Sequence, residues 1–174
     1  MLNSLKEKFS HLEEKECLEF LNEEYFEIID DDEDKKAYII KENGQFKVLN
    51  RARKEIGFIA IDECLFDSSD GSRADCAVFD EKVVAFIELK HCKPKKISTH
   101  RRKAKTQLAA IINFFKKNIT LDRKLEAYIC VTCFDYEGLR VELPRAPRAS
   151  EFETRLEFEK KYDTKLFYKC KKEF

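Results

Sequence analysis

The sequence predicts an α/β protein whose mixed central sheet is flanked by helices. Residues 73–79 and 83–90 are short apolar segments with the length and composition of neighbouring strands. Residues 98–117 follow with a helical pattern, and residues 125–134 return to an apolar strand. This strand–helix–strand order is typical of a crossover connection, so residues 125–134 should run parallel to their partner in the sheet.

The segments before these strands predict one more helix and one more strand. In residues 11–29, apolar side chains recur every three or four positions between acids, which predicts a helix. The acidic run at 30–34 then predicts a solvated loop. Residues 56–66 are rich in Ile, Phe and Leu and predict a strand, and the polar residues 67–71 predict a loop.

Two hairpins and a C-terminal helix complete the expected elements. Residues 38–40 and 46–48 flank an Asn-Gly dipeptide, which favours a tight turn between paired strands. The apolar segments on either side of Asp80-Glu-Lys82 predict the second hairpin. Residues 144–148 indicate a loop, residues 150–162 a helix, and residues 166–168 a strand that would complete the sheet.

The composition is typical of one globular domain over residues 1–174. The chain is 43% apolar and contains 15 Phe and 6 Tyr, and a domain of this length buries roughly two thirds of its unfolded surface. The first residues are too polar for a signal peptide, and no apolar run approaches the roughly 18 residues of a membrane helix. We therefore expect a cytoplasmic protein without a membrane partner.

The cysteines are expected to be free thiols. Their odd number and irregular spacing do not fit a small disulfide scaffold. Cys130 and Cys133 have the spacing of a metal-binding pair, but on a strand they would point to opposite faces, which favours buried thiols over chelation. The seven positions are Cys17, Cys64, Cys76, Cys92, Cys130, Cys133 and Cys170.

The pattern that indicates chemistry is Asp75, then twelve residues, then Glu88-Leu89-Lys90. The triplet Glu-x-Lys is common in this chain, but only this copy ends an apolar run that reads as a central strand. Glu88 and Lys90 share a face, because side chains two apart on a strand point the same way. A two-residue turn at 81–82, or a four-residue loop, would place Asp75 directly opposite Glu88. A three-residue loop would shift Asp75 and abolish the site.

Two buried acids and a lysine in this arrangement favour a metal site that cleaves phosphodiesters. Unpaired buried charges are costly, and Mg²⁺ prefers carboxylate oxygens and water as ligands. The ion activates a water and neutralises a phosphate, while Lys90 can orient that water or offset developing negative charge. The alternative is a cross-strand ion pair of Asp75 or Glu88 with Lys90.

A basic segment follows the site directly. Lys+Arg and Asp+Glu both number 34, yet Leu89 to Leu121 contains ten basic residues and no acid. A phosphate backbone is the natural partner of such a segment, although a solvated basic face is the alternative. The candidate nucleic-acid-binding residues are Arg73, Lys93, Lys95, Lys96, Arg101, Arg102 and Lys105.

Together these features resemble the PD-(D/E)xK nuclease superfamily, which has the restriction-endonuclease-like fold, and within it the RecB-like nucleases. The resemblance runs through residues 71–75, 86–90 and 106–111 and covers roughly residues 56–132. Ala74 stands where the motif has its proline. Glu24, one of several glutamates in residues 11–29, is a candidate for the family's Glu from the first helix, and His11 is a candidate for its upstream His.

The resemblance implies a role for each motif residue. Asp75 and Glu88 would bind Mg²⁺ or Mn²⁺, with the backbone carbonyl of Leu89 as a further ligand. Lys90 would assist the attacking water, and Gln107 would support the site from the helix. His91 and His100 flank the site; a role in binding phosphate or activating water is open for each, as is an ordinary partly exposed histidine.

The leading hypothesis is a metal-dependent nuclease, with DNA as the expected substrate and phage defence or DNA repair as the setting. The first alternative is a catalytically inactive nuclease-fold module that binds nucleic acid or a partner protein. The second is an interaction protein that uses aromatic residues near Phe152, Phe158 and Phe174. A homodimer or larger complex remains open.

Overall fold

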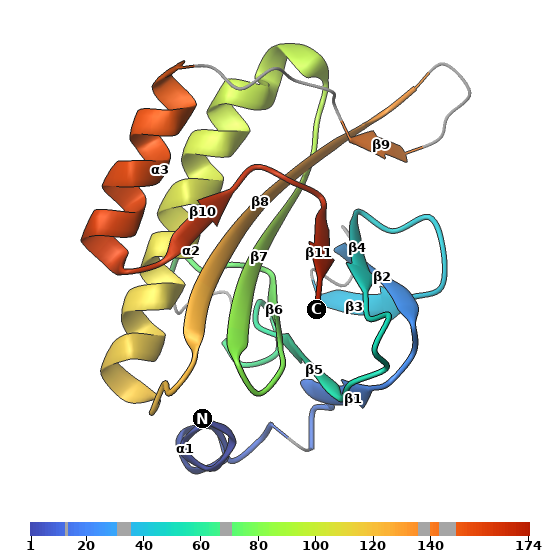
Figure 1. Ribbon diagram of the computed structural model, residues 1–174, viewed down its shortest axis with the longest axis vertical. Helices are drawn as coiled ribbons and strands as arrows, with labels where there is room; N and C mark the ends of the chain where they lie inside the picture. The colour runs from blue at the N-terminus through green and yellow to red at the C-terminus, as the bar shows by residue number, and fades with distance from the viewer. Residues whose placement is uncertain (13, 31–35, 67–70, 136–139, 143–148) are drawn as a thin grey trace.

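The computed structural model describes residues 1–12, 14–30, 36–66, 71–135, 140–142 and 149–174. In this part of the chain, seven strands form a large mixed sheet and four strands form a small sheet. Helices α2 and α3 lie on one side of the large sheet, and the small sheet lies on its other side (Figure 1). This arrangement confirms the α/β class and the mixed sheet flanked by helices. The elements are α1 (Leu2–Lys8), β1 (Leu18–Leu21), β2 (Tyr25–Asp30), β3 (Ala37–Ile40), β4 (Phe46–Leu49), β5 (Ile56–Ala60), β6 (Cys76–Phe79), β7 (Val83–His91), η1 (Pro94–Lys96), α2 (Ile97–Asn118), β8 (Lys124–Phe134), β9 (Arg140–Glu142), α3 (Ala149–Tyr162), β10 (Lys165–Phe167) and β11 (Lys171–Glu173).

The predicted crossover is confirmed by β7, α2 and β8. β7 and β8 run parallel over their whole contact, from Val83 beside Lys124 to His91 beside Thr132. The large sheet has the order β1-β5-β6-β7-β8-β10, with β9 also pairing with β8. β10 joins β8 in parallel and completes the sheet, as expected from residues 166–168. The two central strands are buried on both faces, which explains their nearly continuous apolar sequence.

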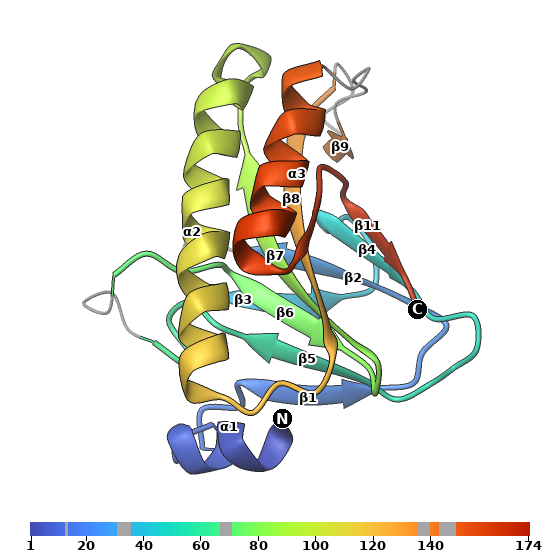
Figure 2. The same cartoon turned by 60° about the vertical axis from the view of Figure 1, so that its left-hand side comes forward.

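Helix α2 covers one face of β7 and β8, and α3 lies beside it (Figure 2). Phe115 of α2 meets Phe86 of β7 edge to face, with 5.0 Å between the ring centroids. This contact shows that even-numbered residues of β7 point toward α2. The buried residues of α2 recur at helical spacing and are Ala104, Gln107, Leu108, Ile111, Ile112 and Phe115.

The small sheet packs against the opposite face of β8. It has the order β11-β4-β2-β3. Phe46 of β4 contacts Tyr128 of β8, with 5.4 Å between the ring centroids. The thiol of Cys130 lies on the same face of β8 and donates to the Gln45 carbonyl at 3.0 Å. The sequence did not predict this second sheet.

The predicted helix over residues 11–29 is wrong, because the segment contains β1 and β2. The three-and-four spacing of apolar residues also contains a spacing of two: Phe26 and Ile28 are both buried and point toward the large sheet. Tyr25, Phe26 and the two following isoleucines also favour a strand. The apolar spacing of residues 25–30 is compatible with both a helix and a strand. Pairing with β3 and β4 makes this segment a strand.

The pairing predicted across the Asn-Gly dipeptide is also wrong, although both flanking segments are strands. β3 and β4 each pair with β2, which lies between them. Asn43 does have a positive φ of 66°, and the Gly44 N–H donates to the Glu27 carboxylate of β2 at 2.5 Å. A Cβ at Gly44 would lie 2.6 Å from the Glu27 Cβ. Glycine is therefore required here by the close approach of β2.

The strand predicted for residues 56–66 stops at Ala60. The chain then turns, with the Leu65 N–H donating to the Ile61 carbonyl at 3.1 Å. The loops predicted for 30–34, 67–71 and 144–148 fall mostly outside the described residues. These exclude 31–34 of the first loop, 67–70 of the second and all of the third. None of the described helices is both long and apolar enough to span a membrane.

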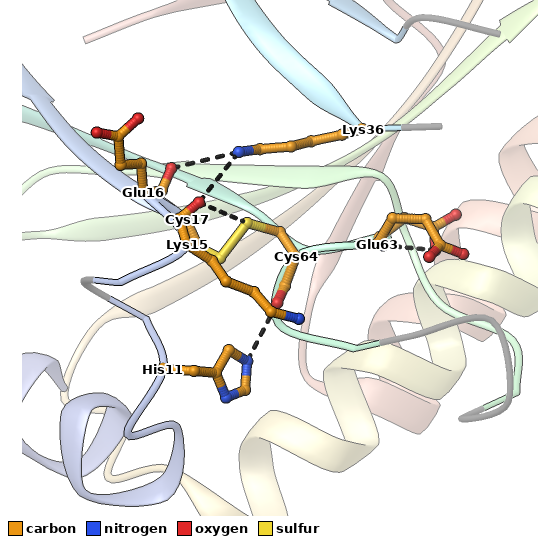
Figure 3. Close-up of a disulfide and its surroundings, with 8 residues drawn as sticks. His11, Lys15, Glu16, Cys17, Lys36, Glu63 and Cys64 are labelled. Atoms are coloured by element: carbon orange, nitrogen blue, oxygen red, sulfur yellow. Dashed lines mark hydrogen bonds between the residues drawn. A yellow bond between two sulfur atoms is a disulfide. The ribbon is translucent and has the colours of Figure 1, made fainter. Parts of the chain in front are cut away.

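Cys17 and Cys64 form a disulfide, so the prediction of free thiols is wrong for this pair (Figure 3). Cys17 precedes β1 and Cys64 lies in the turn after β5, and these two strands pair in antiparallel fashion. The bond therefore ties the start of the sheet edge to the turn that follows its neighbour. The other five cysteines are free and buried, which confirms the prediction for Cys130 and Cys133.

Loss of this disulfide should destabilise the fold. The bond links residues 47 positions apart, so the reduced chain regains the conformational entropy of that loop. We expect the double variant Cys17→Ser/Cys64→Ser to lose about 3–4 kcal/mol of unfolding free energy in urea denaturation. A dithiol reductant should lower the stability of the wild type and leave the double variant unchanged. A wild-type protein insensitive to reductant would contradict this account.

Candidate active site

The turn between β6 and β7 sets the register of the site. The Asp80 N–H donates to the Val83 carbonyl at 3.1 Å, and Asp80 Oδ1 accepts the N–H groups of Lys82 and Val83 at 2.8 Å each. Burial alone would raise the pKa of Asp80, but these backbone bonds and Lys54 lower it below its ordinary value. An ionised Asp80 thus stabilises a two-residue turn at 81–82.

This turn brings Asp75 opposite Glu88. The β6–β7 ladder ends with Cys76 beside Ile87, so the next positions outward are the two acids. The even-length register predicted from the sequence is confirmed. Lys90 follows two residues after Glu88 and shares its face, which is the face covered by α2.

Backbone groups from β7 and from the turn after β5 hold Asp75 in place. The Leu89 N–H donates to Asp75 Oδ2 at 2.5 Å. The Asp75 carbonyl accepts the N–H groups of Ile61 and Asp62 at 2.9 and 3.3 Å. The second contact comes from the turn after β5, which also carries one end of the disulfide. Asp75 is only 2% exposed, so its position is fixed from both sides.

Lys90 lies between the two carboxylates. Its Nζ is 2.5 Å from Glu88 Oε1 and 3.8 Å from Asp75 Oδ2. Glu88 is fully buried, and neither of its carboxylate oxygens accepts a hydrogen bond from the described residues in good geometry. One ammonium therefore faces two buried acids, and the site carries an excess of negative charge when both are ionised.

The shifts in pKa follow from this charge balance. Burial is the main cause that raises the pKa of Asp75 to about 7, and Lys90 only partly opposes it. Burial and the neighbouring Asp75 raise the pKa of Glu88 well above its ordinary value. Burial alone would lower the pKa of Lys90, but the two carboxylates outweigh it and raise that pKa. Without a further cation, the two acids therefore tend to hold protons at neutral pH.

Gln107 lies near the site but binds the backbone beside it. Its side-chain amide donates to the Arg73 carbonyl at 2.9 Å, and its Oε1 is buried without a hydrogen-bond partner among the described residues. Gln107 thus fixes the segment that leads into Asp75. The structure brings it to the site by way of this backbone contact, and no direct contact with either carboxylate is recorded for the described residues.

Arg73 is buried, which argues against the phosphate contact expected from the sequence. Its Nε donates to Asp62 Oδ1 at 2.6 Å, and another guanidinium nitrogen lies 3.7 Å from Glu63 Oε1. A third contact joins it to the Gly71 carbonyl at 2.9 Å. We therefore assign Arg73 to the support of Asp75 and leave it out of the nucleic-acid surface.

The other basic candidates divide by exposure. Arg101 is paired with Glu151 and lies over the ring of Tyr168, so its guanidinium is mostly engaged within the protein. Lys105 is partly buried. The candidates that remain exposed are Lys93, Lys95 and Lys96, which precede α2, and Arg102 in its second turn.

Two residues proposed as family counterparts lie away from the carboxylates. Glu24 is exposed between β1 and β2 and pairs with Arg53 at 3.4 Å, so it does not join the site. His11 Nε2 lies 3.1 Å from the Cys64 carbonyl at the disulfide (Figure 3). Glu24 therefore does not take the role of the first-helix Glu.

The flanking histidines differ. His91 Nδ1 lies 3.2 Å from the Thr132 hydroxyl, on the face of β7 away from Glu88. Burial is the main cause that lowers the pKa of His100, and nearby Lys90 adds to it. His100 is therefore a neutral neighbour of Lys90 at physiological pH.

Sequence reasoning missed two acids that act on the site. Asp30 at the end of β2 and Asp62 in the turn after β5 both raise the pKa of Asp75. Asp30 was hidden by the helix predicted over residues 11–29 and by the acidic run that follows. Asp62 lay inside the segment predicted as a strand. The sequence pattern therefore did not distinguish Asp30 or Asp62 from ordinary surface acids.

The donor chemistry of the site fits a hard divalent cation. Among the described residues, no cluster of three or more His, Cys, Asp or Glu side chains could hold a metal ion. Asp75 and Glu88 still provide two facing carboxylates, and among the described residues the buried oxygens of Glu88 have no hydrogen-bond donor apart from the Lys90 ammonium. Carboxylate oxygens completed by water are the ligand set that Mg²⁺ and Mn²⁺ accept.

Comparison of the chain with family models, with curated proteins and with solved structures finds no match. The geometry and charge of the site are therefore what supports a function.

The raised pKa values predict how stability changes with pH in the absence of metal. A carboxyl whose pKa is raised on folding binds more protons in the folded than in the unfolded state, so stability falls as pH rises from about 4 to about 7. Asp75→Asn should remove this effect. In EDTA, we expect the wild type to lose more unfolding free energy than Asp75→Asn between about pH 5 and pH 8, by a margin on the order of 2 kcal/mol.

Urea denaturation at both pH values measures this difference. Glu81→Gln is the matched control, because Glu81 lies in the same hairpin with an exposed side chain. It should follow the wild type. Equal pH dependence in the wild type and Asp75→Asn would show that Asp75 ionises normally.

Proposed function

We propose that this protein is a metal-dependent nuclease that hydrolyses phosphodiester bonds of nucleic acid, with DNA as the expected substrate. The proposal includes the restriction-endonuclease-like fold. It also includes membership of the PD-(D/E)xK superfamily, on the motif residues described above. The Cys17–Cys64 disulfide argues against the cytoplasmic location expected from the sequence, because disulfides rarely persist in a reducing compartment.

The observation that carries the proposal is the buried pairing of Asp75 and Glu88 with a single lysine. Two acids in an apolar setting are costly unless a cation compensates them. Lys90 supplies one positive charge, and the oxygens of Glu88 lack other donors in the described residues. A structural ion pair would be satisfied with one acid, whereas two acids and a lysine suit a divalent ion and a phosphate.

Asp75 and Glu88 would hold Mg²⁺ or Mn²⁺, and the Leu89 carbonyl is the third proposed ligand. When bound, such an ion lowers the pKa of a water and neutralises charge on a phosphate. The Leu89 N–H keeps Asp75 Oδ2 oriented, and the turn after β5 keeps its backbone in place. These contacts hold Asp75 in position. For a cation to bind both carboxylates, the Lys90 ammonium has to move from its place between them.

Lys90 acts as a cationic hydrogen-bond donor in this proposal. The carboxylates raise its pKa, so it remains protonated at neutral pH and cannot serve as a general base in this state. Its Nζ can orient the attacking water or stabilise a negative phosphate oxygen. Gln107 and Arg73 position the Asp75 segment and do not take part in the chemistry.

The exposed basic residues at the start of α2 favour a polyanionic substrate. Lys93, Lys95 and Lys96 lie within a few residues of the end of β7, which carries Lys90, and Arg102 lies in the second turn of α2. Phosphate contacts of this kind supply affinity without sequence preference. They would guide the backbone of a nucleic acid toward the acids.

A second candidate is a catalytically inactive module that binds nucleic acid or a partner protein. The observation in its favour is that the Lys90 ammonium already lies within 3.8 Å of both carboxylates. If Lys90 stays there, the site is a structural ion triad and needs no metal. For the interaction-protein alternative, Phe152 is 63% exposed, but Phe158 is 3% exposed and cannot contribute a surface.

Cleavage assays test the proposal directly. We expect the wild type to cut nucleic acid with Mg²⁺ or Mn²⁺ and not with EDTA, over a panel of single- and double-stranded DNA and RNA. Asp75→Asn, Glu88→Gln and Lys90→Met should each reduce the rate by on the order of 100-fold or more, because each removes a group that acts on the reacting phosphate or its metal.

Glu81→Gln and Lys82→Met are the matched controls at the turn of the same hairpin, where both side chains are exposed. They should leave the rate unchanged. A wild type that cleaves no member of the panel with either metal would favour the inactive module. Full activity in all three site variants would show that the cleavage arises elsewhere.

A further inference from the structure

An aromatic ring projects from the sheet at the end of β8. Phe134 is the last residue of this strand and is 56% exposed. Its ring is held on two sides: the His91 ring of β7 lies 4.2 Å away between centroids, and the Arg140 guanidinium of β9 lies 5.5 Å from its centroid. Single exposed apolar residues are common, but this one is fixed in place and still open to solvent.

The strands that hold this ring also carry the proposed site, which lies on the opposite face of β7, because His91 and Lys90 are consecutive strand residues. His91 directly follows Lys90, and its Nδ1 lies 3.2 Å from the Thr132 hydroxyl. That hydroxyl lies 3.5 Å from the Lys90 carbonyl. The Phe134 ring therefore packs against the residue that directly follows Lys90.

The location of the ring agrees with a path for a nucleic-acid strand. The β8–β9 pair extends from the end of the large sheet at which β7 ends and η1 and α2 begin (Figures 1 and 2). The exposed lysines Lys93, Lys95 and Lys96 lie in this same connection. A strand bound there would meet phosphate-binding lysines and an aromatic ring on neighbouring elements.

An unpaired base is the ligand that this combination recognises. In a duplex, both faces of a base are covered by its neighbours, so only an unpaired base can present a π face to a protein ring. Stacking on an aromatic residue requires no particular base. A guanidinium beside the ring can stack on the base as well or bind the phosphate of the same nucleotide.

We propose that Phe134, His91 and Arg140 form a stacking platform for an unpaired base, which makes single-stranded nucleic acid the substrate class of the site. This inference rests on the proposed nuclease function and narrows its substrate. The exposed Phe152 of α3 differs: within the described residues it makes no ring or cation contact, and it lies on another element. It is therefore a matched control.

Binding in EDTA tests the platform without cleavage. Fluorescence anisotropy would compare a labelled single-stranded oligothymidylate, the corresponding oligouridylate and a DNA duplex of equal length. We expect Phe134→Ala to weaken single-strand binding by about 5- to 100-fold, the loss of one base stack. Duplex binding should change by less than about twofold, because phosphate contacts dominate it. Comparing the affinities for oligothymidylate and oligouridylate shows whether the protein prefers single-stranded DNA or RNA.

The controls separate stacking from folding. Phe134→Tyr keeps an aromatic face and should restore single-strand binding, whereas Phe152→Ala should bind like the wild type. No loss of single-strand affinity in Phe134→Ala, or an equal loss for single strand and duplex, would overturn the platform. If the wild type fails to cleave but Phe134→Ala shows the selective loss, the nuclease proposal falls and the platform stands. If the wild type cleaves and Phe134→Ala binds single strands normally, the platform proposal falls and the nuclease proposal stands.

Discussion

The structure around the site depends on the mutual burial of Asp75 and Glu88 with one lysine to balance them. A two-residue turn stabilised by Asp80 brings the two acids opposite each other. Burial raises the pKa of both, so the metal-free site keeps its charge low by binding protons. An arrangement that costs stability in this way is typical of sites where function outweighs folding.

The surrounding elements limit how far the acids can move. The turn after β5 holds the Asp75 backbone and, through Asp62, the buried guanidinium of Arg73. Gln107 of α2 binds the carbonyl of the same residue from the other side. Cys64 ties this turn to the start of β1. Backbone hydrogen bonds, a buried ion pair and a disulfide thus hold the segment that carries Asp75.

The part of the fold nearest the site was the most predictable from sequence. Two apolar strands with a short charged turn and an amphipathic helix leave few alternatives, so the register of Asp75 with Glu88 and the parallel crossover were confirmed. The helix predicted over residues 11–29 was wrong because the apolar spacing there fits a helix and a strand alike. Pairing of β1 with β5, and of β2 with β3 and β4, decides between them. The contacts of Arg73 and Asp62, like the disulfide, depend on tertiary proximity that composition does not encode.

Calorimetric titration of Mn²⁺ into the metal-free protein at mildly alkaline pH tests the central claim that Asp75 and Glu88 form a metal centre. The account predicts saturable binding in the wild type and in the exposed control Glu81→Gln, and its loss in Glu88→Gln. Binding should also weaken at acidic pH, where protons compete for the two carboxylates. Absence of saturable binding in the wild type, or equal binding in Glu88→Gln, would contradict the account.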